Sequence, residues 1–117
     1  MSPKEQRSCT LYLEDMLESM RKIETYISGI SYETFASTSI IIDAVVSNLE
    51  IIGEAASHIP DEIREKHEQI PWKKVIGLRN ISIHEYFHVD LPTVWHIIRE
   101  QLPITKMQLQ EITANGK

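Results

Sequence analysis

Apolar residues recur along this chain at spacings of three and four, which is typical of one face of an α-helix. The first such pattern follows a capping-box sequence at Ser2 and Glu5, and it predicts a helix that runs to Gly29. A second pattern predicts a helix over about 39–58 that is apolar on two sides. No useful stretch has the period of a β-strand. The pattern therefore predicts an all-α, up-and-down bundle of four to five helices, in a single domain over residues 1–117.

Residues at the ends and in the interior of the second helix add detail to this prediction. Phe35 is expected to anchor the link before it, and Ser37 or Thr38 is expected to cap its free amides. Gly53 lies in the interior, where glycine costs about 1 kcal/mol relative to alanine, so we expect close approach by another helix. A short helical turn is predicted over 60–67.

Two further helices complete the predicted bundle. Pro71 suits the first position of a helix that runs to about Phe87. Asp90 is then expected to cap the last helix. Pro103 falls inside that helix and cannot donate a backbone hydrogen bond, which predicts a kink near 99–102 or a break into two helices.

An arginine occupies the middle of the apolar side of the predicted helix over 71–87. The apolar positions that share a face with Arg79 are Trp72, Val75, Ile76, Ile83 and Tyr86. A guanidinium buried without a partner would cost several kcal/mol, so this face is expected to meet an anion, a carboxylate or an open cleft. Asn80, His84 and Phe87 form the neighbouring row, which brings the polar trio Arg79, Asn80 and His84 to one edge.

Composition and charge narrow the possible functions. Hydrophobic residues at 42% and charged residues at 25% are ordinary for a soluble globular protein, and no apolar run approaches the length of a membrane span. The N-terminus does not resemble a secretory signal and Cys9 has no partner for an internal disulfide, so we expect a cytoplasmic protein. The net charge of −5 argues against general electrostatic capture of nucleic acid, and any work on RNA must depend on a local site.

One motif in the 79–88 stretch suggests a zinc site. His84, Glu85 and His88 match the His-Glu-x-x-His pattern, in which two histidines bind zinc and the glutamate activates a metal-bound water. The predicted helix ends just after His88, and Val94 occupies the metzincin position of a third ligand. The conceivable third ligands on the last helix are Glu100 and Glu111.

A second reading of the same stretch extends along most of the chain. The segments LEDML from Leu13, NLEIIGEAA from Asn48, IPWKKVIGLRN from Ile70, HEYFHVDLPTVW from His84 and QLP from Gln101 occur in order and at matching spacings. In these segments the chain resembles the HEPN superfamily, and specifically the HepT-like toxins paired with minimal nucleotidyltransferases in type VII-like toxin–antitoxin systems. The family commonly has glycine where this chain has Glu85 or His88.

The resemblance implies a homodimeric helical bundle that is a metal-independent endoribonuclease without a cofactor. Its Arg-x4-His motif corresponds to Arg79 and His84, and the motifs of two protomers would line a shared cleft. The chemistry of these side chains agrees, because His84 suits proton transfer and Arg79 suits stabilisation of a charged phosphate. Asn80 would support them by hydrogen bonds to the imidazole or the phosphate.

Tyr86 has two possible roles. A tyrosine seven residues beyond Arg79 on a helix is often a core or interface residue with a wet hydroxyl. The resemblance implies instead that a cognate minimal nucleotidyltransferase (MntA-like) attaches AMP to Tyr86 and silences the toxin. The added phosphate could then occupy the site beside Arg79.

A different class of function stays open at this point. The acidic net charge also fits a non-catalytic helical dimer or adaptor that binds a nucleotidyltransferase or a nucleotide without cleaving RNA. Activity on RNA in EDTA separates the three possibilities, because a zinc hydrolase would lose activity and an adaptor would have none.

Overall fold

The computed structural model describes residues 3–81 and 90–115, and in these ranges the chain is helical with no strand. The all-α prediction is confirmed. Within the same ranges, no helix is long and apolar enough to span a membrane. The elements in chain order are α1 (Pro3–Ile27), α2 (Tyr32–Ser37), α3 (Ser39–Ser57), α4 (Asp61–Lys66), α5 (Trp72–Gly77), the 3₁₀ turn η1 (Leu78–Asn80), α6 (Leu91–His96), the π-helical turn η3 (Ile97–Gln101) and α7 (Leu102–Asn115).

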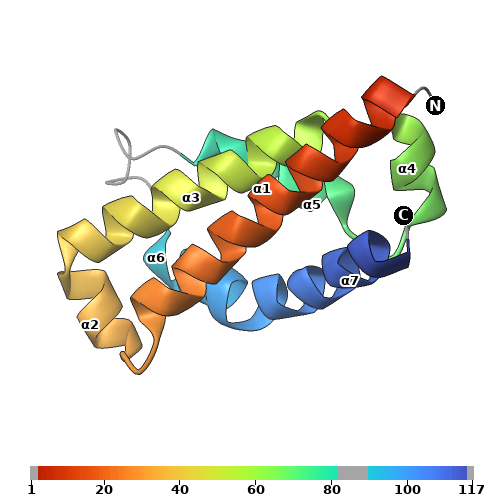
Figure 1. Cartoon of the computed structure of the whole chain (residues 1–117). Helices are drawn as coiled ribbons and strands as arrows, with labels where there is room; N and C mark the ends of the chain where they lie inside the picture. The colour runs from red at the N-terminus through yellow and green to blue at the C-terminus, as the bar shows by residue number, and fades with distance from the viewer. Residues whose placement is uncertain (1–2, 82–89, 116–117) are drawn as a thin grey trace.

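Helices α1 and α3 are the two long elements, and they pack against each other along much of their length (Figure 1). Helix α1 ends at the expected place, where Gly29 adopts a φ of 74°. Helix α7 lies along another side of α1 and is tied to it by an ion pair between Lys106 Nζ and Glu24 Oε1 at 2.5 Å. The fully buried side chains at the centre of this arrangement include Met16, Met20, Val45, Leu49, Ile52 and Leu109.

The segment between the two long helices differs from the prediction. It contains a helix of its own, α2, which Ser31 caps by accepting a hydrogen bond from the backbone N–H of Thr34 at 3.1 Å. Neither residue expected to cap α3 does so. Ser37 Oγ donates to the Glu33 carbonyl at 2.7 Å, and Thr38 Oγ1 donates to the Thr34 carbonyl at 2.6 Å. Both hydroxyls therefore bond back to the preceding turn of α2, which removes them from the start of α3.

An aromatic cluster attaches α2 to the C-terminal half of the chain. Phe35 is fully buried, as predicted, and its ring lies 5.1 Å from that of Trp95 in α6. Tyr32 meets the same Trp95 ring edge-on at 6.0 Å. The guanidinium of Arg99 lies 5.5 Å from the centroid of the Trp95 ring, which is within range of a cation–π contact. These contacts fix where α6 begins to pack on the bundle.

The C-terminal helix is divided as the position of Pro103 predicts. Asp90 accepts a hydrogen bond from the backbone N–H of Thr93 and caps α6. The next turn, η3, is π-helical, and the N–H of Leu102 donates to the carbonyl of Ile97 five residues earlier. A wider turn therefore lies directly before the proline, which has no N–H to continue the α-helical pattern.

The helix predicted over 71–87 is shorter than expected, which is a correction. Helix α5 ends at Gly77, the 3₁₀ turn η1 ends at Asn80, and Ile81 is extended with φ −81° and ψ 119°. The Ile81 N–H closes the turn by bonding to the Leu78 carbonyl at 3.2 Å. Glycine is a poor helix former and β-branched isoleucine favours extended backbone, so the local sequence is consistent with this early end. Residues 82–89 lie outside the described part of the chain.

Gly53 confirms the expectation of a close helix approach. A Cβ atom at this position of α3 would clash with the backbone nitrogen of Arg79 and would lie 2.9 Å from both the Arg79 Cβ and the Ile76 carbonyl oxygen. The backbone of α5 and η1 thus runs directly against α3 at the one place where α3 has no side chain. This contact fixes the position of the Arg79 backbone relative to α3.

Gly53→Ala should therefore destabilise the protein by about 1–3 kcal/mol, although alanine is the better helix former. The matched control is Gly77→Ala, because a Cβ at Gly77 would meet nothing within 4 Å. That variant should be neutral or up to about 1 kcal/mol more stable. Urea unfolding followed by circular dichroism, at one protein concentration, compares the two. Equal stability of both variants would contradict the close approach.

Candidate functional site

Arg79 and Asn80 lie at the end of the polypeptide segment that crosses α3. Both side chains are exposed, whereas the preceding residue, Leu78, is 7% exposed and points into the core. The three residues form the 3₁₀ turn η1. Two contacts fix the turn: the Leu78 side chain is buried in the core, and the Arg79 backbone packs against Gly53 of α3. A fixed backbone thus presents Arg79 and Asn80 to solvent.

The surroundings of Arg79 correct one part of the sequence prediction. Trp72 and Val75, expected on its face, are buried in the chain's own core, and Trp72 Nε1 donates to the His67 carbonyl at 3.0 Å. Arg79 follows them in the 3₁₀ turn η1, after which the chain is extended at Ile81. The Arg79 side chain is 44% exposed. The prediction that this guanidinium avoids a dry core is confirmed.

A carboxylate from α3 faces the guanidinium, and sequence reasoning missed it. Arg79 Nη1 lies 3.7 Å from Glu54 Oε2, and the other Glu54 oxygen lies 3.4 Å from His58 Nε2. The His58 ring stacks on the ring of Tyr12 in α1, with centroids 4.8 Å apart and planes at 14°. Glu54 directly follows Gly53 in the sequence. The glycine could have indicated this carboxylate from the sequence. A segment that packs closely on Gly53 must also pass near the side chain of the next residue in α3, which is Glu54.

The remaining predicted site residues lie outside the described part of the chain. These are His84 and Tyr86, and also Glu85 and His88 of the zinc alternative. Within residues 3–81 and 90–115, no group of three or more histidine, cysteine, aspartate or glutamate side chains is placed to hold a metal ion. The conceivable third zinc ligands, Glu100 and Glu111, are exposed on η3 and α7.

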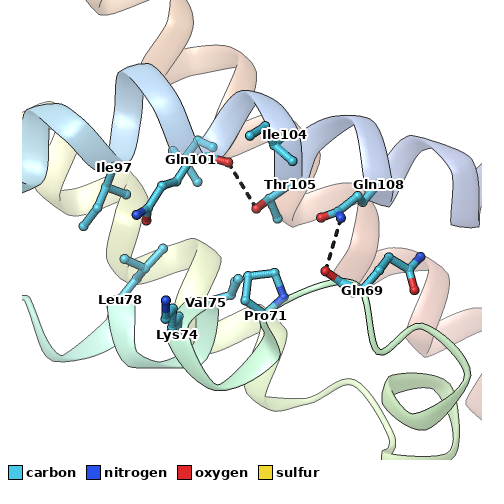
Figure 2. Close-up of a pocket in the computed structure, with 11 residues that line it drawn as sticks. Gln69, Pro71, Lys74, Val75, Leu78, Ile97, Gln101, Ile104, Thr105 and Gln108 are labelled. Carbon is cyan, nitrogen blue, oxygen red and sulfur yellow. Dashed lines mark hydrogen bonds between the residues drawn. The ribbon is translucent and has the colours of Figure 1, made fainter.

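A groove of about 310 Å³ lies on the other side of α5, between that helix and the η3–α7 region (Figure 2). Its walls are mostly aliphatic, with Lys74 and several glutamine amides at the edges. Gln108 Nε2 closes one side by donating to the Gln69 carbonyl at 3.2 Å. Leu78 lines the groove, but neither Arg79 nor Asn80 does. The groove and the arginine therefore occupy different faces of the α5–η1 segment.

The sequence profile of the family described as "Ribonuclease HepT-like" matches residues 16–112. This match covers most of the chain, from the middle of α1 almost to the end of α7. The chain belongs to this family. The resemblance seen in the sequence is thereby confirmed, and the match includes the α3–η1 crossing as well as residues 82–89.

Proteins with similar sequences carry related names. "Putative RNase TTE0752" from Caldanaerobacter subterraneus subsp. tengcongensis is 40% identical over 91% of this chain and 95% of its own length. "Putative RNase MJ1380" from Methanocaldococcus jannaschii is 39% identical over 89% of this chain and 95% of its own. "Probable ribonuclease HepT" from Thermococcus cleftensis is 36% identical over 91% of this chain and 96% of its own. No solved structure matches the chain significantly.

Proposed function

We propose that this chain is a metal-independent endoribonuclease, the toxin of a cytoplasmic toxin–antitoxin pair, and that it cleaves RNA at a site formed by two copies of the chain. The observation that carries the proposal is the position of Arg79. In a member of the ribonuclease HepT-like family, this guanidinium lies exposed on a fixed backbone turn instead of being buried in the core. Relatives named as ribonucleases support the same activity.

The proposed reaction uses the substrate's own nucleophile. The 2′-hydroxyl oxygen of RNA attacks the adjacent phosphorus, the bond to the 5′-oxygen breaks, and a 2′,3′-cyclic phosphate and a 5′-hydroxyl result. One imidazole takes the 2′-hydroxyl proton and one imidazolium donates a proton to the leaving oxygen, which is the role of His84. Arg79 stabilises the charge on the phosphate oxygens, and Asn80 supports either group by hydrogen bonding.

A two-fold dimer answers the need for both an acid and a base. Each chain supplies one His84, and a two-fold axis near Arg79 would bring a second His84 and a second Arg79 to the same phosphate. The outer face of α3 fits such an axis, because Ile40 is 77% exposed and Ile51 is 47% exposed. Ile51 lies one turn before Glu54 on α3, and it is Glu54 whose carboxylate approaches the Arg79 guanidinium. We therefore assign the homodimer contact to this face of α3.

Purified protein should cleave RNA in excess EDTA, and His84→Ala should lower the rate by about 10²–10⁴-fold because proton transfer is lost. Arg79→Ala should cause a loss of similar size, with little change in the free energy of unfolding, because its side chain is exposed and its ion pair is weak. Gel analysis of a labelled RNA measures the rates, and urea unfolding measures stability.

The matched control for His84→Ala is His96→Ala, an exposed histidine at the end of α6 that should keep full activity. Cleavage that stops in EDTA and returns with zinc would favour the His84–Glu85–His88 metal site instead. Absence of cleavage by folded, dimeric protein under all conditions would favour the adaptor alternative.

Ile51→Glu should weaken the dimer and lower the specific activity in parallel, because it places a charge in the proposed apolar contact. Met107→Glu is the control, since Met107 is 63% exposed on α7, away from α3. Sedimentation velocity gives the dimer fraction across a dilution series, and the RNA assay gives the rate in the same samples. Full activity in a monomeric Ile51→Glu protein would overturn the composite site.

We also propose that the cognate minimal nucleotidyltransferase inactivates the chain by transferring AMP to the Tyr86 hydroxyl. Protein co-expressed with that partner should carry AMP at Tyr86 by peptide mass spectrometry, and its RNA cleavage should fall below detection. The added phosphate would place negative charge where the RNA phosphate has to bind.

Tyr86→Phe supplies the control, because it removes the acceptor hydroxyl and keeps the ring. That variant should remain unmodified and active in the presence of the partner. Wild-type protein that is fully inhibited by the partner and yet carries no AMP would rule out this mechanism in favour of inhibition by binding alone.

A further inference from the structure

Glu54 is placed to control the arginine of the proposed site. Gly53 lets the η1 backbone lie against α3, so the Arg79 side chain starts beside the next residue of α3, which is Glu54. Its carboxylate Oε2 lies 3.7 Å from Arg79 Nη1. The packing on Gly53 thus fixes the backbone of Arg79, and helix α3 fixes the backbone of Glu54.

The contact is weak by its geometry. A separation of 3.7 Å is longer than a hydrogen bond, and both side chains are well exposed, with 44% of Arg79 and 60% of Glu54 accessible. Among the described residues, no hydrogen bond to the Arg79 guanidinium accompanies this ion pair. As far as the described residues go, the guanidinium donors are thus left for a ligand, and they match the oxygens of a phosphate in planar, bidentate geometry.

A second side chain lies close to the Glu54 carboxylate. His58 Nε2 lies 3.4 Å from Glu54 Oε1, and the His58 ring stacks on Tyr12 of α1. Each carboxylate oxygen thus faces a different nitrogen-bearing side chain. An RNA phosphate that binds Arg79 would have to displace the Glu54 carboxylate from the guanidinium. The carboxylate would remain nearby, and its negative charge would repel the phosphate.

We propose that Glu54 is a positioning residue that occupies Arg79 between turnovers and competes with the RNA phosphate for its guanidinium. The inference rests on the proposed function, since it names the internal competitor of the substrate at the same site. Glu54 acts only through Arg79 and takes no part in the proton transfers. Its negative charge sets how tightly the site holds RNA, and it makes the free site a poor binder of other anions.

Glu54→Gln should tighten binding of a 2′-O-methyl RNA, which lacks the attacking hydroxyl, by about three- to tenfold at low salt. The gain should shrink as salt rises, because the charges are exposed. For cleavable RNA, KM should fall by a similar factor while kcat stays within about threefold, because the competition affects the ground state and the transition state alike. Fluorescence anisotropy gives the binding constants.

Two controls isolate the effect of this contact. Glu111→Gln removes the same charge from an exposed position on α7 and should leave binding nearly unchanged. In an Arg79→Ala background, Glu54→Gln should also leave RNA binding unchanged, because Arg79, through which Glu54 acts, is absent. The four proteins form a double-mutant cycle that measures this coupling. Glu54→Asp keeps the charge and should bind RNA like the wild type.

The results separate this inference from the proposed function. Unchanged or weaker binding by folded Glu54→Gln overturns the inference, even if wild-type protein cleaves RNA. Tighter binding that persists without Arg79 overturns it as well, because the effect is then one of general charge. Tighter, Arg79-dependent binding in a protein that never cleaves RNA supports the competition and refutes only the nuclease.

Discussion

The arrangement of this molecule depends on one contact between two backbones, where the α5–η1 segment crosses α3 at Gly53. A Cβ atom at that position would clash with the Arg79 backbone nitrogen, so the crossing segment would have to move away from α3. Because the backbone of Arg79 itself lies in this contact, the packing of the bundle fixes where a cation emerges at its surface. The glycine therefore lowers the stability of α3 locally, but it allows the close packing that fixes the position of the Arg79 backbone.

Much of the fold could be predicted from the pattern of apolar residues, because burial of a helix face follows directly from spacings of three and four. Helices α1 and α3, the anchoring by Phe35, the cap at Asp90 and the disruption before Pro103 all follow from such local signals. The errors arose where several local preferences competed. Ser37 and Thr38 are good caps in isolation, but their hydroxyls bond to the preceding turn. Apolar spacing alone also could not show that the chain leaves the helix at Ile81.

The candidate site was predictable in a different way. The motif containing Arg79, Asn80, His84 and Tyr86 was visible in the sequence, and the family it indicated is confirmed by the profile match. Glu54 was not visible as part of that site, because 24 residues lie between it and Arg79 and only the helix crossing brings the two together. The acidic net charge is compatible with the proposed function, in which a few placed cations and not a basic surface would hold the RNA.

The π-helical turn η3 affects how α7 is rotated about its axis relative to α6. A turn closed by a hydrogen bond from residue 102 to residue 97 holds one residue more than an α-helical turn. Val94, Ile98 and Leu102, which follow one another at steps of four across this turn, all face the core. Deletion of one residue here would rotate all of α7 by about 100° relative to α6. The number of residues in η3 is thus constrained as tightly as the side chains on either side of it, because both determine which residues face the core.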